Sequence, residues 1–181
     1  MTRPIPVFLS VALALLVAPL AAPAAEDSRP SAGFRAQHAE IQIHLGHLDG
    51  MLSSLEGAAV DEQRKTMAFV ARFLDEHIRS HAAWEEAKLY PLVDSRASQG
   101  GEPFSASMRY EHGIVGRGID ELAALAGAAT PDAKAFARAG QRLLGVISAH
   151  FEKEEEVFLP ILDRTMTREE LEKALGEPAG H

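Results

Sequence analysis

The stretch "SHAAWEEAKLYPLVD", Ser80 to Asp94, is repeated 69 residues later as "AHFEKEEEVFLPILD", Ala149 to Asp163. Both copies place a histidine, two adjacent glutamates, a proline and a closing aspartate at the same offsets. A chain that repeats such a phrase is built from two related halves. Any role proposed for the charged residues must therefore hold for both copies.

The sequence around both copies has the periodicity of helices. Apolar and histidine residues recur three or four positions apart, which is the spacing of one buried helix face. Four such stripes run through His38, Ile41, Leu45, Leu48 and Leu52; Val70, Leu74, His77, His81, Trp84/Glu85, Lys88 and Leu92; His112, Val115, Ile119, Leu122 and Ala126; and Leu143, Ile147, His150, Glu154, Val157/Phe158 and Ile161. No stretch alternates convincingly with a period of two. The sequence therefore predicts an all-α fold, an up-down-up-down four-helix bundle over residues 31–163.

Prolines and a capping motif mark the predicted helix ends. Pro91 and Pro160 follow the two His-x-x-x-Glu motifs. Each is predicted to end its helix, because proline lacks the N–H that continues the backbone ladder. Beyond the bundle, Thr167 has a glutamate three positions later, the spacing of a capping box, and Gly176 provides a stop. Residues 164–181 are therefore predicted to form a short C-terminal helix and a tail.

Charged and histidine side chains lie on stripes that should face the core. Residues four apart in a helix are offset by about 40° around the axis and about 6 Å along it, so each His-x-x-x-Glu pair stacks on one face. Burying such groups without partners costs several kcal/mol per ion, and a pair of metal ions would compensate. The residues concerned are His38, His81, Glu85, His112, His150 and Glu154. Because the chain has no cysteine, the donors must be nitrogen and oxygen, which suits iron and leaves manganese or zinc open.

The order His, His-x-x-x-Glu, His, His-x-x-x-Glu over four helices resembles the signature of the hemerythrin-like (HHE cation-binding) family. The resemblance extends over roughly Phe34 to Asp163. It implies a non-haem di-iron centre, oxo- or hydroxo-bridged, with the six residues as its ligands. Glu85 and Glu154 would bridge the two irons, and the four histidines would be terminal ligands.

His77 is a further candidate ligand, because it precedes His81 by one turn on the same stripe. A core histidine, or one that orients His81, would explain its position equally well. Its counterpart in the second half is Val146. Oxygen-carrying hemerythrins take a fifth histidine from the third helix, where the neighbours of His112 in this chain are Met108 and Gly116. Reversible oxygen carriage therefore depends on whether His77 supplies the missing nitrogen.

Other polar residues near the motifs are predicted to lie outside the ligand set. His44 and His47 are on the far side of their helix from His38. Glu86 and Glu155, the second glutamate of each copy, are predicted to be surface or rim residues.

Two functions remain open for such a centre. Six-coordinate irons with these ligands and a bridging oxide keep about two open positions, or about one if His77 binds. The first function is a protein that binds a small diatomic ligand, dioxygen or nitric oxide, for storage, sensing or scavenging. The alternative is a di-iron enzyme that reduces peroxide or nitric oxide, or a ferroxidase-type protein that handles iron. Nothing in the sequence indicates a site for a larger substrate.

The N-terminus has the layout of a secretory signal peptide. Arg3 precedes an apolar run that ends in small residues, with Ala22 and Ala24 as an A-x-A site, so residues 1–24 are predicted to be removed. The alternative is a retained membrane anchor. Removal predicts a periplasmic or secreted protein with no stable membrane anchor. The formal net charge of −8 makes nucleic acid a poor candidate partner, and the sequence leaves the oligomeric state undetermined.

Overall fold

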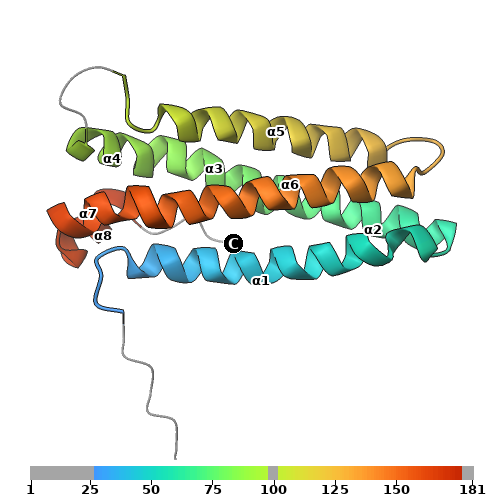
Figure 1. Ribbon diagram of the computed structural model, residues 1–181, viewed down its shortest axis with the longest axis horizontal. Helices are drawn as coiled ribbons and strands as arrows, with labels where there is room; N and C mark the ends of the chain where they lie inside the picture. Colours follow the sequence, from blue (N-terminus) through green and yellow to red (C-terminus); the bar gives the residue numbers. More distant parts are fainter. Residues whose placement is uncertain (1–26, 98–101, 177–181) are drawn as a thin grey trace, which may run out of the picture.

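The computed structural model describes residues 27–97 and 102–176, and these form an antiparallel helical bundle (Figure 1). The first rod is α1 (Ala32–Ser54), which ends in the 3-10 turn η1 (Leu55–Gly57). The second rod comprises α2 (Val60–Phe73), η2 (Leu74–Arg79), α3 (Ser80–Trp84), η3 (Glu85–Leu89) and α4 (Tyr90–Ala97). The third is α5 (Ala106–Ala126), and the fourth comprises α6 (Ala133–Lys153), η4 (Glu154–Phe158) and α7 (Leu159–Thr165).

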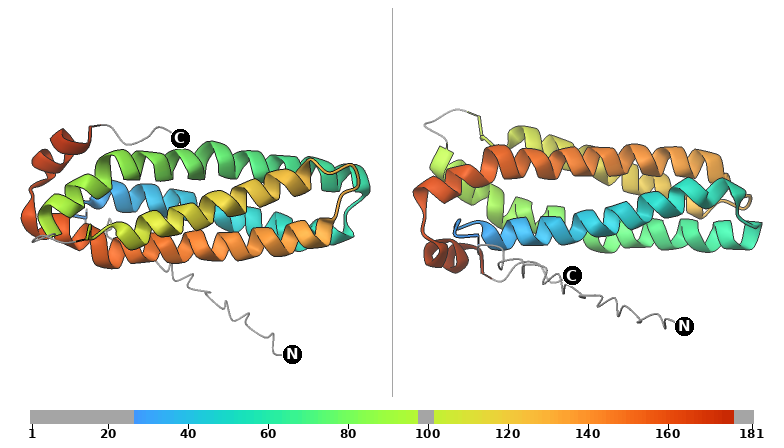
Figure 2. Two further views of the ribbon diagram at one scale, coloured as in Figure 1. Left: turned by 90° about the horizontal axis from the view of Figure 1, so that it is seen from above. Right: turned by 60° about the horizontal axis from the view of Figure 1, so that its bottom comes forward.

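The rods alternate in direction, as the sequence predicts. Helix α5 packs against α2 and α6, and α1 packs against α6, so that the four rods surround one core (Figures 1 and 2). No strand occurs in the described part of the chain. The all-α, up-down-up-down prediction is confirmed. The predicted signal peptide, residues 1–24, lies outside the described residues.

The two prolines do not end their helices, and this part of the prediction is wrong. Pro91 lies inside α4 and Pro160 inside α7, each directly after a π-helical segment. The N–H of Tyr90 donates to the carbonyl of Glu85, five positions earlier rather than four, and Leu159 donates to Glu154 in the same way. A wide π turn before a proline accommodates the missing N–H and the ring, so the rod continues.

The π-helical segments also shift the buried face of the second rod. The sequence places His77, Lys88 and Leu92 on that face, but the first and third are only half-buried and Lys88 is exposed. The buried positions, each one residue later, are Ile78, Leu89 and Val93. A π turn holds more residues than an α turn, so it moves the core-facing position along the chain. The predicted stripe is therefore wrong at these three positions.

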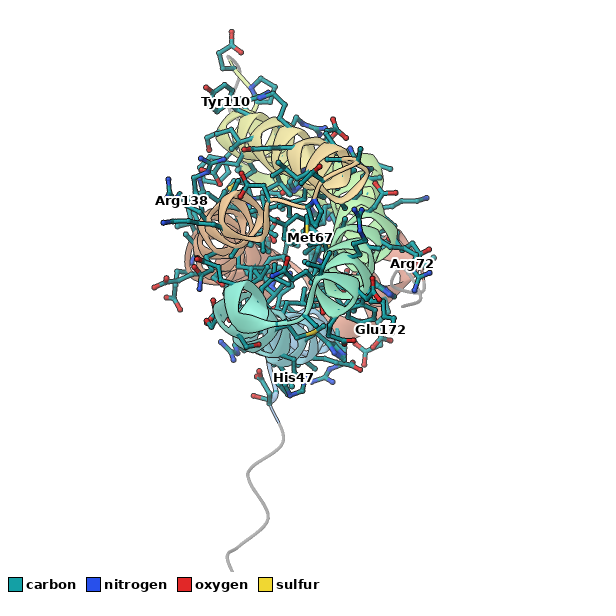
Figure 3. The ribbon with its side chains drawn as sticks, turned by 90° about the vertical axis from the view of Figure 1, so that its right-hand side faces the viewer. His47, Met67, Arg72, Tyr110, Arg138 and Glu172 are labelled. Carbon is teal, nitrogen blue, oxygen red and sulfur yellow. The ribbon has the colours of Figure 1, made fainter. Side chains whose placement is uncertain are left out.

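The core consists of two apolar clusters separated by a polar layer. In α1, Phe34 belongs to one cluster and Ile41 to the other, with His38 between them. Met108 and Val115 flank His112 in α5 in the same way. Viewed along the bundle, a buried residue of the larger cluster, Met67, points into the interior, whereas exposed residues such as Tyr110 project from the surface (Figure 3).

The short helix α8 (Arg168–Leu175) packs across one end of the bundle (Figure 2). Its predicted capping box is confirmed, since the Thr167 hydroxyl accepts from the Glu170 N–H and the Glu170 carboxylate accepts from the Thr167 N–H. Gly176 ends the helix with a φ of 71°, which favours glycine. Leu171 and Leu175 bury against the cluster that contains Phe34. Within residues 27–97 and 102–176, no helix is both long and apolar enough to span a bilayer.

Candidate metal centre

The polar layer brings together six of the seven candidate ligands from all four rods. The histidines come from α1, α3, α5 and α6, and each glutamate is the first residue of a π-helical segment. All six side chains are buried, namely His38, His81, Glu85, His112, His150 and Glu154. The doubled motif thus converges in space although its two copies lie on different rods.

Glu85 belongs to two groups of potential metal ligands at once. One group is His38, His81 and Glu85, the other is Glu85, His112 and His150, and within each group the donor atoms lie within 4.8 Å of one another. Glu85 Oε1 lies 2.8 Å from His81 Nε2 and 3.7 Å from His38 Nε2. Its Oε2 lies 3.2 Å from His112 Nε2. One carboxylate therefore turns one oxygen to each pair of histidines.

Glu154 spans the same two pairs from the opposite rod. Its Oε2 lies 3.5 Å from His38 Nε2, and its Oε1 lies 3.7 Å from His150 Nε2. The two glutamates therefore occupy equivalent places in the two halves. This is an arrangement in which each carboxylate can bridge two cations.

A carboxylate outside the layer faces the Nδ1 atom of three of the histidines. His112 Nδ1 lies 3.0 Å from Glu86, and His38 Nδ1 lies 3.2 Å from Glu155. Glu111 lies 3.1 Å from His150 Nδ1. A carboxylate accepts, so each Nδ1 donates, and the neutral tautomer then points its Nε2 lone pair into the layer. Glu86 and Glu155, which the sequence places on the surface or rim, thus act as acceptors that fix imidazole orientation.

A chain of side chains holds Glu155 in place. Asp163, the closing aspartate of the second copy, accepts from the N–H and hydroxyl of Ser31 at 2.9 and 3.0 Å. Arg35 donates to the Ser31 hydroxyl and to the Glu155 carbonyl. The Arg35 guanidinium also lies 3.7 Å from the Glu155 carboxylate. The closing aspartate is thereby tied to the orientation of His38.

The same chain recurs in the other half. Asp94 accepts from Ser105, Arg109 donates to the Ser105 hydroxyl and to the Glu86 carbonyl, and Glu86 faces His112. Sequence reasoning missed these networks. Their signal is a second repeat, Ser-x-x-x-Arg-x-x-His, which occurs at residues 31–38 and 105–112.

The inward-facing atoms fit a metal ion and are poorly matched to one another. Within the described residues, neither oxygen of Glu85 nor Oε2 of Glu154 accepts a hydrogen bond, although all three atoms are buried. Imidazole lone pairs and carboxylate oxygens that face each other without protons between them repel. A cation removes this conflict, and nitrogen and carboxylate oxygen are donors that iron, manganese and zinc accept.

Protonation differs among the buried groups of the metal-free layer. Burial lowers the pKa of His150 to about 4, so its imidazole is neutral at pH 7. Burial and the neighbouring Glu85 carboxylate raise the pKa of Glu154 well above its usual range. Burial opposes ionisation of Glu85 too, but the charge of the neighbouring His81 outweighs it and holds the pKa of Glu85 well below its usual range. The Glu154 carboxyl group therefore keeps its proton to a higher pH than the Glu85 carboxyl group does.

Aromatic rings close the layer on both sides. Phe151 stacks on His38 with ring centres 4.3 Å apart, and Tyr90 stacks on His112 at 5.2 Å. The Tyr90 hydroxyl donates to Glu154 Oε1 at 2.7 Å. Burial and the carboxylates of Glu85 and Glu154 raise the pKa of Tyr90, so the phenol is protonated in the metal-free protein. Sequence reasoning did not identify Tyr90 as part of the centre.

Two spaces adjoin the layer. A cavity of about 10 Å³ is walled by apolar side chains and by residues of the layer, Ile78, His81, Ala82, Glu85, His112, Val115, Ile147, His150 and Phe151. A surface groove of about 350 Å³ between the second and third rods reaches His112 and Val115 from outside and contains Arg79 and Arg109. Because Ala82, His112 and Val115 line both spaces, the groove lies directly outside the cavity.

The other histidines in the described part of the chain, His44, His47 and His77, lie apart from this layer. His77, the remaining candidate ligand, is half-buried and packs its ring on Phe73 at 4.5 Å. Neither ligand group found among the described residues includes it. His44 and His47 are exposed, as predicted.

Comparison with known proteins gives one result that bears on this geometry. The sequence profile of the hemerythrin HHE cation binding domain matches residues 29–162. No significant match is found among curated proteins or solved structures. The matched region contains the first three rods, all but the last three residues of the fourth, and the six buried residues of the polar layer. The chain therefore belongs to the hemerythrin HHE cation-binding domain family.

Proposed function

We propose that this chain is an exported, non-haem di-iron protein that binds dioxygen or nitric oxide for storage, sensing or scavenging. His38 and His81 would hold one iron, His112 and His150 the other, and Glu85 and Glu154 would join them. Iron in such a centre supplies a change of oxidation state and a position at which a small molecule binds. The chain supplies the oriented imidazoles, the bridging carboxylates and a layer closed to bulk water.

The observation that carries the proposal is the division of Glu85 between two histidine pairs. A carboxylate that binds one ion needs only one pair of histidines beside it. Glu85 has a second pair beside its other oxygen, with His112 Nε2 at 3.2 Å from Oε2. Glu154 repeats the arrangement from the fourth rod. Two ions held between these residues would satisfy all these donor atoms together.

The preference for a small ligand rests on the size and lining of the adjacent cavity. Its volume of about 10 Å³ is close to the minimum that holds one water molecule. Ile78, Val115, Ile147 and Phe151 wall it with apolar groups. A diatomic molecule suits such a space, whereas a larger substrate would have to displace core side chains.

Purified protein loaded anaerobically with ferrous iron is expected to hold about two irons per chain, measured by elemental analysis. Metal loading should raise the melting temperature, because only the folded chain presents the ligands. Exposure to dioxygen or nitric oxide should change the optical spectrum, and removal of the gas should reverse that change. Rapid irreversible oxidation with consumption of peroxide or nitric oxide would support the enzyme alternative instead. A stoichiometry of one iron or none would contradict the proposed centre.

Export rests on the charged, apolar and small-residue pattern of residues 1–24. Protein recovered from the source cell is expected in the periplasm or medium, with a mature chain that begins at Ala25. N-terminal sequencing and cell fractionation measure both. A cytosolic chain that still begins at Met1 would contradict export and leave the metal centre untouched.

A further inference from the structure

The hydroxyl of Tyr90 lies among the donor atoms of one half of the metal centre. Its oxygen is 3.0 Å from His112 Nε2, 3.3 Å from His150 Nε2 and 2.7 Å from Glu154 Oε1. The side chain is fully buried at the start of α4. A phenol that only filled the core would need one hydrogen-bond partner, whereas this oxygen meets three candidate metal ligands.

The separations in this half resemble the edges of one coordination shell. Metal–ligand bonds of about 2.1 Å place neighbouring ligands of an octahedron about 3.0 Å apart. His112 Nε2 lies 3.0 Å from His150 Nε2 and 3.2 Å from Glu85 Oε2, and the Tyr90 oxygen is 2.7 to 3.3 Å from its three neighbours. His150 Nε2 and Glu154 Oε1 are further apart, at 3.7 Å. An ion placed among the nitrogens and carboxylates thus meets the phenol oxygen as well.

A cation and a neighbouring imidazole hold the Tyr90 ring in place. The guanidinium carbon of Arg109 lies 5.3 Å from the centre of the ring, and a cation near an aromatic ring is attracted to its electrons. Stacking on His112 holds the ring in this orientation. The position 69 residues later is Leu159, which offers no donor atom, so this contact belongs to one half of the repeat alone.

We propose that Tyr90 binds, as a phenolate, the metal held by His112 and His150. The inference rests on the proposed two-metal centre and adds to it a ligand outside the repeated motif. When the metal–oxygen bond forms, the hydroxyl proton leaves to the buffer and the oxygen occupies a position otherwise left open. The two metals are then unequal, and the position available to a small molecule lies on the half with His38 and His81.

Ferric iron bound to phenolate has a charge-transfer absorption in the visible range and resonance-enhanced tyrosinate vibrations. The oxidised wild-type protein is expected to show both. Tyr90→Phe should lose both while keeping about two irons per chain by elemental analysis. Tyr110→Phe is the matched control, because Tyr110 is the other tyrosine of the chain and is 69% exposed. That variant should keep the wild-type spectrum.

A redox-inactive metal gives a second readout. Loading the wild-type protein with zinc should produce the ultraviolet difference spectrum of phenol ionisation, and Tyr90→Phe should abolish it. Wild-type protein that holds two irons without a tyrosinate signal would overturn the phenolate ligand and leave the two-metal centre standing. Protein that takes up neither iron nor zinc would contradict the centre itself and this ligand with it.

Discussion

Replacing Glu154 by glutamine is expected to empty the metal centre and to make the metal-free protein more stable at pH 7. The amide removes a bridging anion, so iron content should fall from about two per chain to well below one. In the metal-free fold the amide can still accept from Tyr90 and can donate to His38, which lies 3.5 Å from Oε2. The amide thus keeps the contacts of the protonated carboxyl group without taking up a proton, and each pH unit above the unfolded pKa adds about 1.4 kcal/mol to this advantage until the folded pKa is reached.

The pH dependence of this effect follows from the pKa of Glu154. Burial and Glu85 raise that pKa well above 4.5, so the group favours the fold below its unfolded pKa and loses this contribution as pH rises through the folded value. Metal-free Glu154→Gln should therefore resemble wild type near pH 4 and exceed it in unfolding free energy at pH 7. Chemical denaturation of the metal-free proteins at both values measures this.

Glu85→Gln provides the matched comparison, with the opposite sign for stability. The neighbouring His81 holds the pKa of Glu85 well below its usual range despite its burial. The charged carboxylate thus stabilises the fold above its unfolded pKa, and that contribution is lost as pH falls through the folded value. Glu85→Gln should lose metal like Glu154→Gln but destabilise the metal-free protein at pH 7. Full iron occupancy in either variant would refute the bridging assignment.

Glu86 and Glu155, which accept the Nδ1 protons of His112 and His38, should each affect the affinity of one of the two metal positions. Glu86→Gln replaces the carboxylate that faces His112, and Glu155→Gln the one that faces His38. A neutral amide still accepts the Nδ1 proton but makes the imidazole less basic, and losing such a partner typically weakens metal binding about 10–100-fold. We expect this loss at one metal of the pair in each single variant and at both in the double variant.

Competition with a chelator of known affinity measures this change. Glu156→Gln is the control, because Glu156 follows Glu155 directly and is exposed. It should leave both affinities unchanged. Equal affinities in Glu86→Gln and wild type would show that the 3.0 Å contact with His112 has no role in metal binding.

Much of the fold and of the centre is predictable from periodicity and from the repeat. Four stripes with a spacing of three or four residues predict the bundle, because one apolar helix face must be covered by others. His81 with Glu85, and His150 with Glu154, lie one turn apart whatever surrounds them. His38 and His112 occupy equivalent positions in the two halves, so the repeat predicts that they belong with these pairs. The structure places all six residues in one buried layer.

The acceptors were beyond prediction from the motif because each contact crosses between rods. Glu86 and His112 are 26 positions apart, and His38 and Glu155 are 117 positions apart. Helical spacing shows only that these glutamates lie beside the buried face. Whether such a residue meets solvent or a neighbouring imidazole depends on how closely the rods approach and on which faces they turn to each other.

The sequence by itself determined the helical class, the doubled motif and the six residues that meet in the polar layer, because these depend on local spacing that survives in any bundle. Only the tertiary structure decided the register after Leu74 and the place of Tyr90. Helical periodicity assumes a hydrogen bond to the fourth residue back, but the N–H of Tyr90 bonds to Glu85, five positions earlier. That wider turn puts Leu89 and Tyr90 in the core and leaves Lys88 outside. The wider turn forms where the following residue is a proline, which has no N–H, and where it brings apolar side chains into the core. Which side chains are buried depends on how the rods pack, so the sequence alone does not determine this register.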